Sequence, residues 1–94
     1  MSLDFNHFNI THNLNDMWRA AGCYDALYNS HGKKAKEILP KLESALLWLV
    51  MNPTKAKEYN APNGWGLYEN ALPWLAEVCE YFRNNPDEEI YTCK

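Results

Sequence analysis

Two short polar segments carry the side chains in this sequence that could do chemistry. The first is Asn9-Ile10-Thr11-His12-Asn13, in which hydroxyl, imidazole and amide groups come directly before a run of apolar residues at helical spacing. Helix N-termini present unbonded amides and partial positive charge, so this segment suits a phosphate or carboxylate, and His12 can add a hydrogen bond or a proton. The alternative is local capping, in which Thr11 and Asn13 bond to the backbone and His12 fixes a turn.

The second polar segment is Asn63-Gly64-Trp65-Gly66, followed by Tyr68. Two glycines allow a close backbone approach and leave Trp65 able to stack on a ligand, although a Trp in a tight loop can equally plug the edge of the core. The glycine spacing is not that of a phosphate loop or a dinucleotide fingerprint. We expect Asn63, Trp65 and Tyr68 to share one solvent-open pocket with the first segment, which requires this loop to fold back against the first helix.

Other catalytic chemistry has little support in the sequence. His7 and His12 are five residues apart, and no Cys-x-x-Cys or His-Glu-x-x-His spacing occurs, so we expect no metal and no cofactor. Cys23, Cys79 and Cys93 lie on predicted apolar faces or near the end of the chain, which favours inert thiols over nucleophiles. Their odd number and wide spacing do not form a disulfide framework.

Composition limits the class of protein. The length of 94 residues predicts a single domain spanning 1–94. The net charge is −3. The only basic concentration lies in residues 33–41 and is diluted by neighbouring glutamates, so we expect no nucleic-acid partner. The longest apolar run, 45–51, is far shorter than the ~20 residues that span a bilayer, and no signal peptide is visible. We therefore expect a cytoplasmic protein without a membrane partner.

Hydrophobic periodicity predicts a mainly helical α+β domain. Period-2 alternation indicates short strands at 8–11 and 88–93, while helical spacing indicates helices at 14–28, 33–51, 54–59 and 67–83. Gly22 either ends or weakens the first helix, and Pro40 predicts a kink or a break in the second. We expect a compact domain of three to five helices, closed by a short antiparallel two-stranded pairing of the N- and C-terminal strands.

Several motifs resemble one protein family. They are Asn-Ile-Thr-His-Asn-Leu at 9–14, Ala-Ala-Gly with Tyr-x-Ala-Leu at 20–27, a Leu-Pro-x-Leu helix, and Asn-Gly-Trp-Gly-x-Tyr at 63–68. In this order they resemble a family of small, uncharacterised proteins encoded by phages and prophages, and the resemblance runs from Phe8 to the final strand. Cys23 and the Trp-rich second half depart from the family pattern. The family supplies no catalytic residues to carry over.

The resemblance implies a binding role. By analogy with small phage proteins, we expect a non-catalytic binding protein, an inhibitor of a bacterial defence system in the cytoplasm of the bacterial host. Its partner would be a host protein or a small anionic ligand. Two alternatives stay open at this point. One is a binder of anions or nucleotides, or a weak enzyme that uses His12 as acid–base. The other is a structural or assembly accessory that acts as a homo-oligomer.

Overall fold

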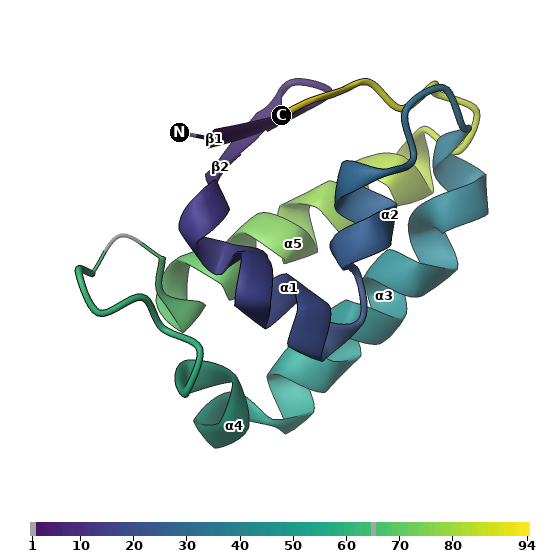
Figure 1. Ribbon diagram of the computed structural model, residues 1–94. Coiled ribbons are helices and arrows are strands. Elements are labelled where there is room, and N and C mark those ends of the chain that lie inside the picture. The colour runs from purple at the N-terminus through teal and green to yellow at the C-terminus, as the bar shows by residue number, and fades with distance from the viewer. Residues whose placement is uncertain (1, 65) are drawn as a thin grey trace.

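The computed structural model describes residues 2–64 and 66–94, which form a helical layer with a small antiparallel sheet beside it (Figure 1). The sheet has three strands in the described residues, in the order β2-β1-β3. These strands are β1 (Ser2–Phe5), β2 (Phe8–Thr11) and β3 (Thr92–Cys93). The predicted α+β class is confirmed. The two ends of the chain do pair antiparallel, but the sheet has three strands where two were expected, and β3 pairs with β1 and not with the strand expected at 8–11.

The central strand of the sheet, β1, was not predicted. Its outward residues are exposed while Leu3 and Phe5 are fully buried against the helices, so it has the alternation of a half-buried strand. A two-residue turn joins it to β2, with Phe5 paired to Phe8 and Asn6 at a φ of 56°. Because β1 lies between β2 and β3, the segment 9–13 forms the end of the edge strand β2 and the start of the next turn, and it does not pair with the C-terminal strand.

The helices follow the predicted spacing closely. In the described residues they are a 3₁₀ turn η1 (His12–Leu14), α1 (Asn15–Ala21), α2 (Tyr24–Tyr28), α3 (Ala35–Met51), α4 (Pro53–Lys57) and α5 (Tyr68–Asn84). The long helices α3 and α5 pack on each other, and α1 and α2 cover α3. Large apolar side chains from these elements fill one core: Leu14, Met17, Trp18, Leu27, Leu42, Leu49, Leu75, Phe82.

Of the two positions where the sequence predicted a helix interruption, Gly22 and Pro40, only Gly22 ends a helix. Gly22 ends α1 in the left-handed conformation, with φ 89° and its amide bonded to the carbonyls of Trp18 and Arg19, so α1 and α2 are separate helices. Pro40 does not break α3, contrary to one prediction. The proline lies in the second turn of the helix, so its missing amide affects only the carbonyl of Lys36 near the helix start.

The C-terminal tail, residues 88–93, bonds both to the turn between β1 and β2 and to the turn before α3. A strand was expected over 88–93, but only Thr92–Cys93 is strand, preceded by a single bridge between Lys34 and Glu89. The tail makes specific bonds instead of a ladder, because Glu88 accepts from the side chains of Asn6 and Tyr81. Next to it, Ile90 bonds through its backbone to the turn that precedes α3.

Candidate functional site

The two predicted polar segments lie against each other. A Cβ built on Gly66 would stand 2.8 Å from the Asn13 Cβ and 3.0 Å from the Asn13 carbonyl carbon, so the loop after α4 packs directly on the start of the first helical segment. No residue larger than glycine fits at position 66 without displacing backbone. Asn63 is exposed in the same loop. Trp65, which we expected to contact a ligand, lies outside the described residues.

Thr11 is a helix cap, as the local-capping alternative for the segment 9–13 predicts. Its Oγ1 accepts a hydrogen bond from the backbone amide of Asn13 at 3.2 Å, and Thr11 therefore caps η1. Asn13, which directly precedes the helix expected at 14–28, is an exposed residue within η1 and not a cap. The reason is that the chain makes a 3₁₀ turn before α1, which moves the cap two residues upstream.

His12 is held in a chain of hydrogen bonds. Its Nδ1 lies 2.8 Å from the hydroxyl oxygen of Tyr28, and that hydroxyl donates to Oδ1 of Asn15 at 2.6 Å. Because the single hydroxyl proton of Tyr28 points to Asn15, His12 must donate its own Nδ1 proton to Tyr28. The neutral ring of His12 then carries its lone pair on Nε2.

A stack of two aromatic rings begins at Tyr28, the partner of His12 in these hydrogen bonds. Tyr24 lies parallel to Tyr28 with ring centroids 4.6 Å apart, and the guanidinium of Arg19 covers Tyr24 at 4.1 Å from its ring centre. Burial, which is the largest cause, raises the pKa of Tyr28 to about 12, so this hydroxyl stays protonated at neutral pH. His12, the two tyrosine rings and Arg19 therefore form one continuous series of contacts.

The Tyr68 side chain is buried in the core. Only 8% of its surface is exposed, and its hydroxyl donates to the carbonyl oxygen of Leu49 at 2.7 Å. Its backbone amide donates to Oδ1 of Asn60 at 2.7 Å, which supports the start of α5. In this arrangement the Tyr68 hydroxyl has a partner within the fold, and the residue explains how α5 docks on the end of α3.

The cysteines have the properties of inert thiols. Cys23 and Cys79 are fully buried, and burial raises the pKa of Cys23 to about 12 and the pKa of Cys79 to about 11. A thiol with such a pKa is protonated at neutral pH and is a poor nucleophile. Within 2–64 and 66–94 there is also no group of three His, Cys, Asp or Glu residues able to hold a metal ion.

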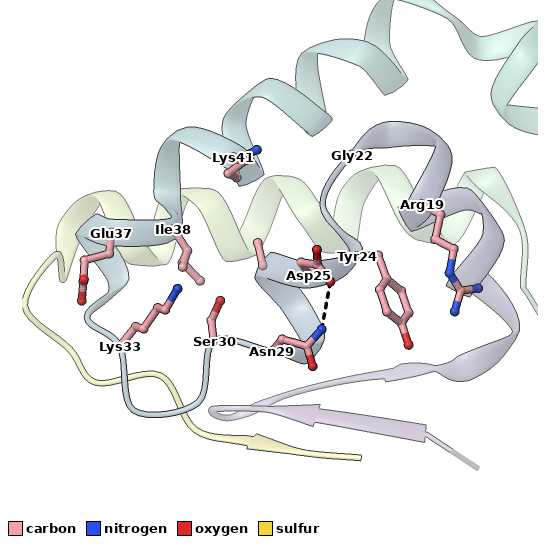
Figure 2. Close-up of a pocket in the computed structure, with 11 residues that line it drawn as sticks. Arg19, Gly22, Tyr24, Asp25, Asn29, Ser30, Lys33, Glu37, Ile38 and Lys41 are labelled. Carbon is pink, nitrogen blue, oxygen red and sulfur yellow. Dashed lines mark hydrogen bonds between the residues drawn. The ribbon is translucent and has the colours of Figure 1, made fainter.

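A cleft of about 900 Å³ lies between the α1–α2 corner and the first half of α3 (Figure 2). This volume is in the range of small-molecule sites. Arg19 and Tyr24 line one side, Ile38 and Lys41 come from α3, and Lys33 comes from the turn before it. The cleft is separate from the pair of polar segments predicted from the sequence.

Most charged and amide groups at the cleft already have partners. Asn29 donates to Asp25 at 2.9 Å, Glu37 accepts the backbone amide of Lys34 at 2.7 Å, and Arg19 pairs with Asp16 at 3.2 Å. Lys33 and Lys41 differ from these groups. In the described part of the chain, neither lysine lies within 4.0 Å of a carboxylate oxygen.

Ser30 is the unusual residue of the cleft. It is only 3% exposed, yet its side chain forms no hydrogen bond with any described residue. Figure 2 shows its hydroxyl on the same side as the Lys33 ammonium. In the described residues the buried side-chain polar atoms without a partner are Nε1 of Trp18 and Nε1 of Trp74, so the Ser30 hydroxyl is instead open to solvent, or to a ligand, at the cleft.

Sequence reasoning missed the cleft, although part of its signal was visible. The lysines of 33–41 are the only basic concentration in the sequence, and the nearby Glu37 and Glu43 weaken that signal. One of those glutamates, Glu37, accepts a backbone amide, and another, Glu43, bonds to Arg83 at 2.8 Å. Only the charge of Glu43 is offset by a cation, because the amide that Glu37 binds is uncharged and Glu37 itself lines the cleft. The sequence alone does not reveal this difference.

Comparison of the chain with protein-family models, curated proteins and solved structures gave no match. Among the helices described, none combines the length and apolar character needed to cross a bilayer. The site is therefore interpreted from its own residues.

Proposed function

We propose that this protein is a non-catalytic binding protein and that the cleft between the α1–α2 corner and α3 is its binding surface. The observation that carries the proposal is the cleft itself, which is lined by two lysines without ion pairs and by a Ser30 hydroxyl that has no hydrogen-bond partner among the described residues. Concave sites with a few convergent polar groups are where small ligands and protruding segments of partners bind.

A binding role fits the chemistry of the cleft better than catalysis. The carboxylates that line it, Asp25 and Glu37, each accept a hydrogen bond from the protein. The thiol of Cys23 is held protonated by its raised pKa. Lysine ammonium groups and a serine hydroxyl without a neighbouring base bind and orient a ligand, but they do not activate a nucleophile.

The biological setting we propose rests on the resemblance to phage and prophage proteins. In that setting the protein acts in the cytoplasm of the bacterial host as an inhibitor of a defence system. The cleft would engage either a host protein or a small anionic ligand on which the defence depends. The resemblance supports this setting only by analogy.

The experiment compares two double charge reversals. The cleft variant Lys33→Glu/Lys41→Glu changes two exposed lysines without ion pairs, and the control Lys55→Glu/Lys57→Glu changes two exposed lysines of α4 outside the cleft. Each purified protein is incubated with bacterial extract and examined by native mass spectrometry. We expect wild type and control to retain a species that the cleft variant loses. Retention of the same species by all three proteins would overturn the proposal.

A second candidate function is a weak acid–base enzyme, and the orientation of His12 favours it. The hydrogen-bond chain through Tyr28 and Asn15 leaves Nε2 of His12 as the basic atom. Nitrogen-15 NMR of the neutral imidazole should therefore show the Nδ1–H tautomer. A dominant Nε2–H tautomer would remove the basis for this candidate.

The remaining candidate is an assembly protein that acts as a homo-oligomer. Leu47, Val50 and Met51 share one face of α3 and are 55–70% exposed, which is unusual for large apolar side chains. This candidate predicts a dimer or larger species in sedimentation velocity at high protein concentration. A strict monomer would exclude it.

A further inference from the structure

We infer that the outer edge of β2 (Phe8–Thr11) pairs antiparallel with the same strand of a second copy of this chain, around a two-fold axis at Asn9. The pairing joins the two sheets into one sheet of six strands, three from each copy. This interface lies outside the cleft and is independent of the function proposed for it.

The register of the sheet fixes which backbone groups of β2 face outward. The Asn6 amide donates to the carbonyl oxygen of Tyr91 at 2.9 Å, so even-numbered residues along β1 and its turn face the C-terminal tail, and odd-numbered residues face β2. Phe8 and Ile10 lie opposite odd-numbered residues of β1 and make the ladder bonds. The amide and carbonyl of Asn9 therefore point to the free side, where no hydrogen bond from a described residue reaches them.

The β2 strand has none of the features that protect an edge strand from further pairing. Its sequence, Phe-Asn-Ile-Thr, contains no charged residue and no proline, and it pairs with β1 over four successive residue pairs without a bulge. The Asn9 side chain donates to Asp4 at 2.6 Å and to Ser2 at 3.0 Å, so it is held over β1 and away from the free edge. In contrast, the opposite edge strand, β3, has only two residues and is followed by Lys94.

The same strand of a second copy is complementary to this edge. With Asn9 opposite Asn9 of the second copy, the outward amides and carbonyls form two hydrogen bonds across the axis. This register places Phe8 of each copy opposite Ile10 of the other, and pairs of an aromatic and a β-branched side chain stabilise antiparallel strands. Because β2 carries no charge, the two-fold axis brings no like charges together.

The side chains on the core face of β2 leave apolar surface for the second copy to cover. Phe8 and Ile10 are only partly buried, whereas Leu3 and Phe5, which lie opposite them on β1, are fully buried. The Phe8 ring also contacts two partly buried rings of α5, Trp74 and Tyr81, with centroids 6.2 Å and 5.7 Å away. An interface built from four-residue strands is small, so we expect a weak dimer that depends on protein concentration.

The test measures amide hydrogen exchange of the full chain by two-dimensional NMR at increasing protein concentration, with sedimentation velocity on the same samples. We expect a monomer–dimer equilibrium in which the Asn9 amide gains protection as the dimer forms. The amides of Phe8 and Ile10 should be protected at every concentration, because they already bond to β1. This readout is made on the wild-type chain and does not depend on whether a variant folds.

Two variants at Asn9 extend the test. Asn9→Lys places like charges on the axis and should raise the dissociation constant of the dimer about tenfold or more. The matched control Asn84→Lys, at the exposed end of α5, should leave it within about twofold. Asn9→Pro removes the outward amide without removing a bond to β1, so it should keep the circular dichroism spectrum of the fold and weaken the dimer as well.

Three results would overturn the inference. One is a strict monomer at a protein concentration of about 1 mM. Another is a dimer in which exchange of the Asn9 amide is unchanged, which would move the interface to another face, such as the exposed apolar side chains of α3. The third is a monomer whose Asn9 amide is protected only by an unrelated uncharged peptide such as oligothreonine, which would assign the edge to a different chain.

Discussion

Removing the hydroxyl of Tyr68 should destabilise the fold without affecting the cleft. In an α-helix the carbonyl of Leu49 would accept from the amide four residues later, but that residue is Pro53, which has no amide proton. The Tyr68 hydroxyl takes this place at 2.7 Å in a buried position. The bond therefore completes the C-terminal end of α3 with a side chain from α5.

The cost of Tyr68→Phe follows from the acceptor that it leaves behind. A buried carbonyl that loses its partner costs about 1–3 kcal/mol. For a domain of this size, each 1 kcal/mol lowers the Tm by about 4–8 °C. The variant should therefore melt at least about 4 °C below wild type, with the loss of stability confirmed by urea denaturation at an unchanged m-value.

Tyr59→Phe is the matched control for this deletion. Tyr59 is 40% exposed, and its hydroxyl has no hydrogen bond to the described residues, so its loss should change stability by less than about 0.5 kcal/mol. Equal stability of the two variants would refute the reasoning. If Tyr68→Phe bound no ligand and yet melted like wild type, Tyr68 would be a ligand-contacting residue, as the sequence first indicated, rather than a structural one.

Two further predictions concern the Gly66 contact and the thiols. Gly66→Ala should cost about 1–3 kcal/mol in urea denaturation, because the new methyl group overlaps Asn13, and an unchanged midpoint would mean that the loop moves freely. At pH 8 a thiol reagent should modify the exposed Cys93 rapidly, and Cys23 and Cys79 only on unfolding. Because the folded chain raises the pKa of both buried thiols above 9, their contribution to stability is complete below pH 9 and is lost as the pH rises toward 11–12. A urea midpoint that rises over that interval would contradict this.

The long helices were predictable because their apolar stripes are long. The final helix was expected at 67–83 and is found at Tyr68–Asn84, since five turns of periodic burial leave little ambiguity. In contrast, β1 has only four residues and two buried side chains, too few to define a period. The C-terminal strand was overestimated because residues 88–91 are held mainly by side chains and turns, which alternation does not distinguish from a ladder.

The candidate site shows the same division between local and long-range information. The approach of Gly66 to Asn13 agrees with the expected fold-back, because a glycine-rich loop signals close packing of backbone. The cleft depends on how α2 lies on α3, and no local pattern encodes that arrangement. The missing partner of Ser30 is likewise visible only after every neighbour of the residue is placed.

The attachment of Ile90 to the Ser30–Lys33 turn has a consequence for synthesis on the ribosome. Residues 30 and 33 leave the ribosome early. The two backbone hydrogen bonds that fix their turn involve Ile90, which follows almost 60 positions later. Helices with local contacts form quickly, whereas contacts distant in sequence form last. A nascent chain would therefore acquire its helical core first and an ordered Ser30–Lys33 turn only after Ile90 has left the ribosome.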